Sequence, residues 1–276
     1  MAHYERFRSL ETVFETKFEL ADELVSRERP VIINADSVPE VFLSPYISKN
    51  PRVLLCGTKD ASQKPNVVIQ SISQNKEGVK LTLDFKEKGK DKSVNLEVPL
   101  FGYHQATNVA LAVSAALELG FPIETIKAAL KTMPQIPNRL EVIQSKGGPT
   151  TINDAYNSNP KGFANALEVL SLLRKPQGRR ILVTPGIVEL GDEHEAQHRL
   201  LGQKAGKIVD LALIIGAQRM ESFIDGFKSS KSQGTTLKIF DTQKEAEDWV
   251  QHNVGPSDTI LFENNLPDLY ETKIRF

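Results

Sequence analysis

One stretch, residues 150–160, brings amide, carboxylate and phenol groups close together in the sequence. Its polar side chains are, in order, Asn153, Asp154, Tyr156, Asn157, Ser158 and Asn159. A β-branched run precedes them, and apolar residues at helical spacing follow Pro160. We therefore expect a strand, a polar loop and a helix that Asn159 caps. Ligands of open α/β sheets bind beyond the carboxyl ends of strands, so this loop is a candidate ligand site. The alternative is a well-capped turn without a ligand.

Composition restricts the function classes. The 276 residues are enough for two ordinary domains, and the 34 basic and 35 acidic residues leave a net charge of -1. No broad field favours nucleic acid or an anionic membrane, although a local phosphate site is compatible with this balance. The single Cys56 excludes an internal disulfide and indicates a buried strand thiol in a reducing compartment. No apolar run approaches the roughly 20 residues that span a bilayer, so we predict a cytoplasmic protein.

The first half of the chain is expected to contain a small α/β arrangement followed by a meander. Apolar spacing predicts an amphipathic helix over residues 7–25 and a helix from 122 to about 133. Short apolar runs at 31–33 and 53–56 predict buried parallel strands. Alternating residues from about 66 to 99 predict a small antiparallel meander, and an Ala-rich helix follows residues 102–108.

Pro134, Pro137 and Asn138 interrupt these patterns, so 133–139 is the best linker candidate, with Arg139 at the hinge. We place the domain boundary after residue 137. Beyond it, strands alternate with helices, which predicts a mostly parallel, doubly wound α/β sheet. The expected strands are 181–183, 211–215, 237–240 and 260–262, and the expected helices are about 194–208, 217–228 and 243–252.

Five motifs occur together in an order and spacing that resemble the Mur ligases. They are Gly102-x-His104-x-x-x-Asn108, Ile136-Pro137-Asn138-Arg139-Leu140-Glu141, Asn153-Asp154-x-Tyr156-Asn157-x-Asn159-Pro160, Glu189-Leu190-Gly191 followed by His198, and the upstream set His3 with Thr16-Lys17-x-Glu19. The resemblance covers nearly the whole chain and is strongest to the branch that joins D-alanyl-D-alanine to a UDP-muramyl tripeptide. It implies an incomplete central ATPase domain over 1–137 and a Rossmann-like C-terminal domain over 138–276.

The chain also departs from the family's pattern. Gln105 follows the motif histidine where Asn is usual, Asn153 replaces the first residue of an Asp-Asp pair, and 184–188 differ from the commoner stretch. No G-x-x-x-x-G-K-S/T phosphate loop occurs in the 276 residues. In the family that loop lies upstream of the position matching His3. We therefore expect the carboxyl half of a ligase, inactive alone.

The resemblance implies an ATP-dependent acid–amino-acid ligase of peptidoglycan synthesis that uses ATP and Mg²⁺. Such enzymes transfer the γ-phosphoryl group to a carboxylate, and an amine then attacks the acyl phosphate. By motif position, Lys17 would be a carbamylated lysine that binds the metal, with His3 nearby. The alternatives are a solvent-facing lysine and a disordered chain end.

The same resemblance suggests which residues bind ATP and the amino substrate. His104 and Asn108 would lie near adenine, Arg139 near the phosphates and Asp154 near the ribose hydroxyls. Tyr156, Asn157 and Asn159 would line the face where dipeptide and nucleotide meet. Glu189, His198, Asn264 and Asp268 could contact the amino substrate, although surface packing is favoured for them. A helix cap is the alternative for Asn108, and an Asx turn is the alternative for Asp154.

Other functions are compatible with these patterns. The partners implied are a UDP-muramyl peptide, D-alanyl-D-alanine and a missing N-terminal half, with no nucleic acid and no membrane. A second hypothesis is a non-catalytic nucleotide- or peptide-binding remnant or subunit. A third is a related amide ligase of the cyanophycin or folylpolyglutamate type.

Overall fold

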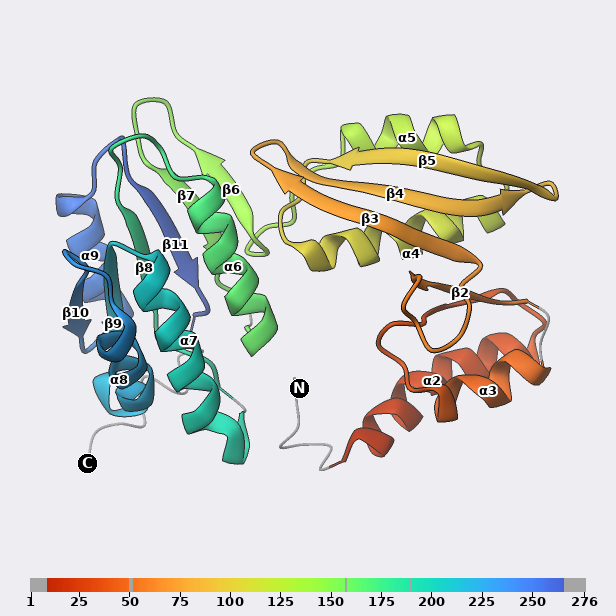
Figure 1. Cartoon of the computed structure of the whole chain (residues 1–276), viewed down its shortest axis with the longest axis horizontal. Helices are drawn as coiled ribbons and strands as arrows, with labels where there is room; N and C mark the ends of the chain where they lie inside the picture. Colours follow the sequence, from red (N-terminus) through yellow and green to blue (C-terminus); the bar gives the residue numbers. More distant parts are fainter. Residues whose placement is uncertain (1–8, 50–51, 157, 189, 266–276) are drawn as a thin grey trace. The chain divides into compact units, whose positions relative to one another are not determined.

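The computed structural model describes residues 9–49, 52–156, 158–188 and 190–265, and the chain divides into two compact units after Pro134 (Figure 1). Each unit has its own sheet. The division falls within the segment 133–139 that the sequence marks as a linker, three residues before the expected boundary. Prolines at 134 and 137 account for the break, because they stop helix α5 (Ile123–Lys131) from continuing.

The sheet of the first unit has the order β1-β2-β3-β4-β5 in the described part of the chain. Its strands are β1 (Val31–Asn34), β2 (Val53–Thr58), β3 (Val67–Asn75), β4 (Gly78–Glu87) and β5 (Lys90–Val98). The first three are parallel, whereas β3, β4 and β5 pair antiparallel. The predicted meander and the predicted parallel strands are both confirmed.

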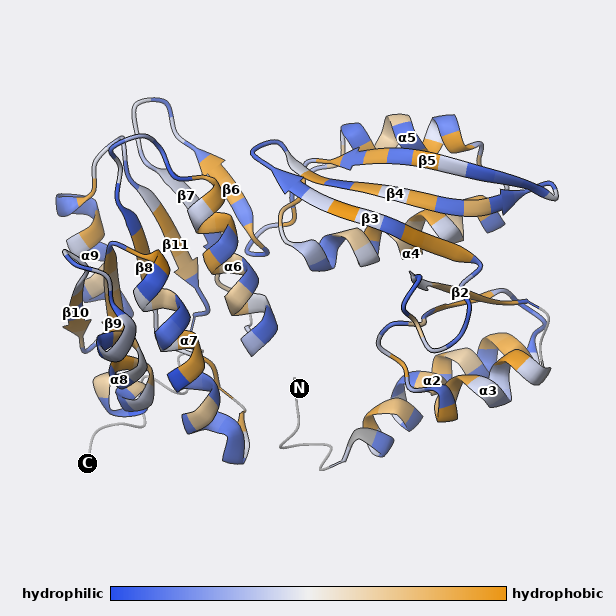
Figure 2. Cartoon of the chain, in the orientation of Figure 1, coloured by the Kyte–Doolittle hydropathy of each residue, from blue (hydrophilic) through white to orange (hydrophobic). Residues whose placement is uncertain are grey.

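Helices cover β1 and β2 on both faces. Val31 and Leu55 pack with Phe18 of α2 (Leu10–Ser26) and with α3 (Glu40–Lys49), whereas the fully buried Cys56 belongs to the core beneath α4 (Tyr103–Glu118). Alternate strand residues face opposite sides, so the residues of these short apolar runs are all buried or half-buried. The predicted burial of the Cys56 thiol is confirmed. Figure 2 shows the apolar colouring of β1 and β2.

Within the described part of the first unit, helices cover one face of the meander. Its apolar residues pack against α4 and α5. On the opposite face Ser71 bonds Thr82 at 3.0 Å, and Thr82 donates to Asn95 at 2.8 Å. This alternation of apolar and polar residues follows from an antiparallel sheet with one solvated face.

The sheet of the second unit has the order β10-β9-β8-β11-β7-β6 in the described part of the chain. Its strands are β6 (Glu141–Gln144), β7 (Thr150–Asp154), β8 (Arg180–Thr184), β9 (Leu211–Ile215), β10 (Thr236–Phe240) and β11 (Thr259–Glu263). All neighbouring pairs are parallel except β6 with β7. The predicted mostly parallel α/β sheet is confirmed. Strand β6 was not predicted, because it is short and partly exposed.

Helices lie on both faces of this sheet (Figure 1). Ile181 and Leu213 pack with Ala246 of α9 (Gln243–Asn253). The alternate residues of the same strands face α6 (Pro160–Leu172), α7 (His194–Ile208) and α8 (Glu221–Ser230), where Phe163 stacks on Phe223. Helices α7 and α8 approach closely at a glycine, since a Cβ on Gly202 would lie 2.1 Å from the Phe223 carbonyl oxygen.

Three neighbouring parallel strands, β8, β11 and β7, end at the same edge of this sheet. The loops that follow β8, β11 and β7 contain residues 185–190, 264–265 and 155–159, respectively. This edge therefore gathers side chains from three distant parts of the sequence.

Candidate functional site

Two carboxyl groups lie side by side at the carboxyl ends of β7 and β11. Asp154 and Glu263 are register partners on these parallel strands, and Glu263 is fully buried while Asp154 is 8% exposed. The Ser158 hydroxyl donates to Glu263 Oε1. Glu263 Oε2 has no hydrogen-bond partner among the described residues. A buried carboxyl pair of this kind cannot hold two negative charges without a large free-energy penalty.

Burial dominates the ionisation of both groups. It raises the pKa of Asp154 to about 6, although the Leu140 N–H and the Arg139 charge act in the opposite direction. Burial raises the pKa of Glu263 well above its ordinary value, and the Asp154 charge raises it further. Burial thus opposes ionisation of both groups, and the Arg139 charge favours ionisation of Asp154.

Arg139 is attached to the end of β7 through its neighbours. The Leu140 N–H donates to Asp154 Oδ1 at 3.1 Å, Asn153 donates to Asn138 Oδ1 at 2.8 Å, and the Tyr156 N–H donates to the Asn138 carbonyl at 3.3 Å. Asn138 and Leu140 both have positive φ, which turns the chain sharply on either side of Arg139. The structure thus brings Arg139, Asp154 and Tyr156 together, and their roles toward a ligand stay predictions.

Asn264 connects the loops after β11 and β8. Its backbone N–H donates to the Asp154 carbonyl at 3.0 Å, and its Nδ2 donates to the Gly186 carbonyl at 2.6 Å. Asn264 has a φ of +61° and is 4% exposed. Asn264 therefore connects the loops that follow β11 and β8 through its backbone N–H and its Nδ2.

His198 holds the loop after β8 from beneath. Its ring lies on the inner face of α7 and has no exposed surface. Nε2 accepts a hydrogen bond from the Ile187 N–H at 3.1 Å, and Nδ1 faces the His194 carbonyl oxygen at 2.9 Å. Both contacts are satisfied when Nδ1 carries the hydrogen. Burial is the main reason that the pKa of His198 is lowered to about 4.

The surface packing favoured for His198 and Asn264 is wrong, because both side chains are buried and bonded to backbone. Contact of either residue with an amino substrate stays a prediction. The sequence analysis nominated His198 only because it follows the Glu189-Leu190-Gly191 motif. In the structure its side chain lies on the inner, buried face of α7.

Lys17, His104 and Asn108 belong to the first unit, whereas Arg139 and Asp154 belong to the second. Lys17 is exposed on α2, and His104 and Asn108 are exposed in the first two turns of α4. Asn108 donates to Gln105 Oε1 at 3.1 Å, and the helix is capped by Gly102, so the helix-cap alternative for Asn108 is wrong.

The local role predicted for Asn159 is confirmed, since its Oδ1 accepts from the Gly162 N–H at 2.9 Å as the cap of α6. The Asp154 carboxylate accepts from the N–H of Leu140, a residue 14 positions earlier in the chain. This is a long-range contact and not the local hydrogen bond of an Asx turn. The candidates His3, Asn157, Glu189 and Asp268 lie outside the described residues.

Sequence reasoning missed Glu263 and did not give Ser158 a role of its own. The signal for Glu263 was a carboxylate directly after the apolar run Ile260-Leu261-Phe262, at the end of a buried strand. A charged residue in that position marks the ligand edge of a parallel sheet.

The described residues provide no ready metal centre. They contain no group of three or more His, Cys, Asp or Glu side chains that could hold a metal ion. The described residues therefore do not by themselves supply a site for the Mg²⁺ that the family resemblance implies. The same part of the chain has no helix long and apolar enough to cross a membrane.

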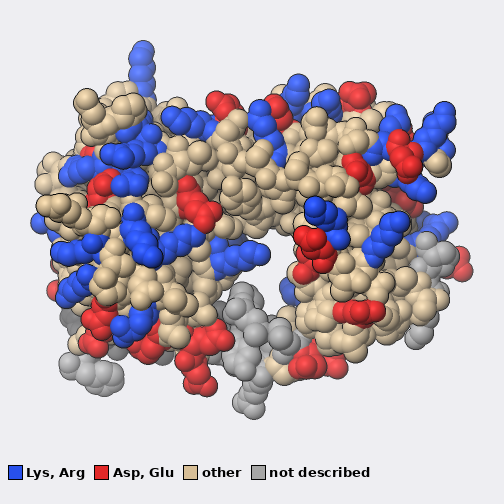
Figure 3. All heavy atoms as spheres, viewed as in Figure 1, with Lys and Arg blue, Asp and Glu red and all other residues tan. Residues whose placement is uncertain are grey.

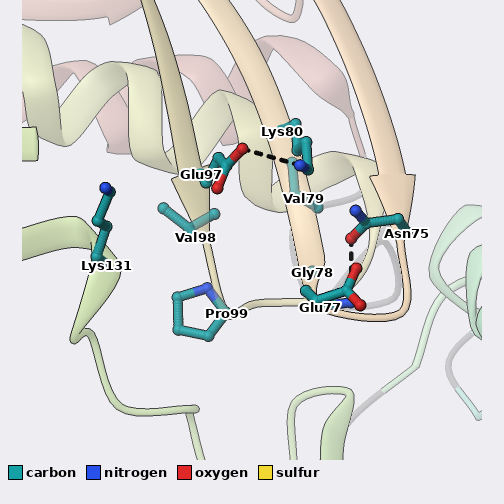
Figure 4. A pocket seen from close by; sticks show the side chains of 9 residues that line it. All are labelled: Asn75, Glu77, Gly78, Val79, Lys80, Glu97, Val98, Pro99 and Lys131. Carbon is teal, nitrogen blue, oxygen red and sulfur yellow. Dashed lines mark hydrogen bonds and ion pairs between the residues drawn. The ribbon is translucent and has the colours of Figure 1, made fainter.

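A surface hollow of about 170 Å³ lies in the first unit, between the β3–β4 turn, the end of β5 and Lys131 (Figure 4). Lys80 and Glu97 at its wall pair with each other at 2.8 Å. None of the candidate site residues lines it. Figure 3 shows basic and acidic side chains both present on the visible face.

Comparison with known proteins decides the family. Residues 1–116 match the model of the Mur ligase middle domain, and residues 138–263 match that of the Mur ligase glutamate ligase domain. The chain belongs to the Mur ligase family. The resemblance that the motifs predicted is confirmed, and the two Mur ligase domains match the two halves of the sequence.

Curated relatives of this Mur ligase chain are D-alanyl-D-alanine ligases. The UDP-N-acetylmuramoyl-tripeptide--D-alanyl-D-alanine ligase of Bacillus subtilis is 27% identical over 266 residues, which cover 95% of this chain and 53% of the relative. The enzyme of the same name from Mycobacterium tuberculosis is 28% identical over 224 residues, covering 79% and 42%. The chain spans about half the length of the curated relatives it matches.

Solved structures show the same Mur ligase fold. MurF from Acinetobacter baumannii superposes with a TM-score of 0.73 at 24% identity, over 96% of this chain and 54% of that one. MurF from Thermotoga maritima, in complex with ADP, gives a TM-score of 0.69 at 21% identity, over 96% and 56%.

Proposed function

We propose that this chain is the carboxyl part of a ligase that joins D-alanyl-D-alanine to a UDP-muramyl tripeptide in peptidoglycan synthesis, using ATP and an acyl-phosphate intermediate. The names of its relatives support the substrates. The observation that carries the proposal is the attachment of Arg139 to the end of β7 beside Asp154. A cation and a carboxylate at one sheet edge suit the phosphates and the ribose of a nucleotide.

Each candidate side chain would bind a different part of the nucleotide or of the amino substrate. Asp154 would accept hydrogen bonds from the ribose hydroxyls, and the planar Arg139 guanidinium would bind phosphate oxygens in a bidentate manner. His104 and Asn108 would contact adenine. Tyr156, Asn157, Asn159 and Glu189 would face the incoming dipeptide. The amine needs only to be held close to the acyl carbon, since orientation alone lowers the barrier substantially.

Magnesium would offset the charge of the phosphates, with Lys17 and His3 as its candidate ligands. The described residues do not form a metal site, so no catalytic step is assigned through the ion. A location in the cytoplasm follows from the proposal, because its UDP-linked substrate is soluble.

The test compares the chain alone with a completed enzyme. The 276-residue chain is incubated with magnesium, ATP, UDP-muramyl tripeptide and D-alanyl-D-alanine, and phosphate release is measured with and without the dipeptide. The assay is repeated with an N-terminal half that carries a G-x-x-x-x-G-K-S/T loop, fused or in trans. Loss of a single oxyanion donor costs about 10²–10³ in rate, so we expect dipeptide-dependent release only in the second assay. Asp154→Asn in the fused enzyme should reduce it, whereas Lys244→Gln, an exposed change on α9, should not.

The two other hypotheses give different results. A non-catalytic nucleotide-binding module would bind ADP yet give no ligation in either assay. A ligase of the cyanophycin or folylpolyglutamate type would release phosphate with its own amino substrate and not with D-alanyl-D-alanine. Dipeptide-dependent release by the chain alone would contradict the proposal.

A further inference from the structure

We propose that Glu263 is a positioning residue for Asp154: a neutral carboxylic acid that shares one proton with the Asp154 carboxylate, so that the pair carries a single negative charge. The effect on nucleotide binding rests on the proposed function, whereas the shared proton does not. No motif pointed to Glu263, and the sequence did not assign it a role.

The placement of the two side chains follows from the sheet. Asp154 and Glu263 are register partners on adjacent parallel strands, which lie about 4.8 Å apart, so both side chains point to the same face. Neither can move away, because each ends a buried strand and Glu263 has no exposed surface. The pair is therefore held together by backbone pairing and does not depend on flexible loops.

The surrounding hydrogen bonds determine which oxygen carries the proton. The Ser158 hydroxyl donates to Glu263 Oε1, and the Leu140 N–H donates to Asp154 Oδ1. Each carboxyl group thus has one oxygen already engaged as an acceptor. Glu263 Oε2 is buried without a hydrogen-bond partner among the described residues. Because the two side chains are close enough to act on each other through a hydrogen bond, we place the shared proton between Oε2 and Asp154. A buried carboxyl oxygen without a partner is costly, and sharing the proton removes that cost.

Charges near the pair place the negative charge on Asp154. The charged group that favours ionisation there is Arg139, which acts on Asp154. Among the described residues, the groups that act on Glu263 are the Asp154 carboxyl and the Ser158 hydroxyl. Two ionised carboxyl groups in this position would repel each other without solvent screening. One proton therefore stays with the pair, and Asp154 keeps its charge beside Arg139.

The sign of the pH dependence follows from the raised pKa values of both groups. Well below the unfolded pKa values of about 3.9 and about 4.3, both carboxyl groups are protonated in the folded and in the unfolded chain, so the pair imposes no penalty. As pH rises, the unfolded chain releases its protons first, because the folded pKa values are higher. Folding stability contributed by the pair therefore falls as pH rises from about 4 towards neutrality and beyond.

The first experiment measures urea unfolding of the 276-residue chain at pH 5 and pH 8. Glu263→Gln keeps the size and a donor but cannot ionise, and Glu247→Gln, exposed on α9, is the matched control. From pH 5 to pH 8, the equilibrium constant for unfolding should increase in the wild type by a factor that is at least about ten times larger than in Glu263→Gln. This difference corresponds to about 1.4 kcal/mol. Glu247→Gln should follow the wild type. Equal pH dependences of stability in the wild type and Glu263→Gln would overturn the shared proton. The wild type should also show an infrared band of a protonated carboxyl group that is missing from Glu263→Gln, and the same spectrum for both proteins would overturn the proposal as well.

The second experiment measures ADP affinity by calorimetry across the same pH range. Glu263→Gln should retain the wild-type affinity within about threefold, whereas Glu263→Ala, which removes the donor, should lose about tenfold or more. Equal losses in both variants would overturn the positioning role. If Glu263→Ala does not fold, the pH dependence of ADP affinity in Glu263→Gln and Ser158→Ala still tests the positioning role. Absence of ADP binding by the folded wild type would contradict the proposed function, and the unfolding experiment would still decide the shared proton.

Discussion

The guanidinium carbon of Arg139 lies 4.3 Å from the centre of the Tyr156 ring. Tyr156 is 68% exposed, so the contact is a cation–π interaction at the surface of the sheet edge and not part of a core. It joins the turn at 138–140 to the loop after β7. The face of the ring thereby limits the directions in which the arginine can reach a ligand.

Tyr156→Ala should weaken ADP binding by about twofold to fivefold, because a surface cation–π contact contributes about 0.5–1 kcal/mol. Tyr156→Phe should retain the affinity, since the ring face is kept. Arg139→Ala should lose about tenfold or more. Calorimetry on the folded chain measures all three, and an equal loss in the Phe and Ala variants would show that the hydroxyl and not the ring holds the arginine.

The buried His198 should make folding sensitive to acid. Its pKa is lowered to about 4, chiefly by burial, with His194, Arg219 and Glu195 as the charged groups that also act on it. The unfolded value is near 6.5, so the stability contributed by the neutral ring is fully present above about pH 6.5 and is lost as pH falls towards 4. This slope is opposite to that of the Asp154–Glu263 pair, so each must be measured as a difference between wild type and variant.

His198→Ala should destabilise the chain by about 2 kcal/mol at pH 7, because the Ile187 N–H loses its buried acceptor. It should also remove the loss of stability between pH 6.5 and 4. His252→Ala, an exposed change on α9, is the control and should have neither effect. Thermal unfolding across this pH range checks the result, and an unchanged acid slope in His198→Ala would contradict the assignment.

Lys17→Ala in the complete enzyme should abolish ligation if Lys17 carries a carbamate that binds magnesium. Its place on α2, exposed and within the Thr16-Lys17-x-Glu19 motif, leaves the amine accessible for that modification. Added short-chain carboxylates should restore part of the activity. Lys244→Ala should remain fully active, and full activity in Lys17→Ala would exclude the metal role.

The second unit should fold by itself, and its stability should depend on where it begins. Gln135 donates to the Val142 carbonyl at 3.1 Å and accepts from the Val142 N–H at 2.7 Å, which ties it to the edge strand β6. A piece that starts at residue 135 should therefore unfold cooperatively and be about 1 kcal/mol more stable than one that starts at 138. Urea unfolding followed by circular dichroism compares the two. A dye-binding, non-cooperative product from both would mean that the units share a core.

Local patterns were sufficient for most of the elements. The helix over 194–208 and the strand over 211–215 were predicted with the bounds that the structure has, because their apolar residues repeat at a helical and a strand period. Helix α3 was missed, since Pro45 lies inside it and its apolar residues do not form a narrow stripe. Strand β6 was missed because an edge strand with partly exposed residues carries little alternation.

The sequence by itself determined the family, the two-part organisation of the chain and the nomination of Arg139 and Asp154, because these depend on residue types at fixed local spacing. Only the tertiary structure decided which groups share an environment. Strand β11, the last strand described, inserts between β8 and β7, so Glu263 meets Asp154 and Ser158 across more than 100 residues of chain. The burial of His198 likewise depends on which face of α7 meets the sheet. No local pattern encodes the order of strands, and the ionisation of a carboxyl group or an imidazole follows from its neighbours in space.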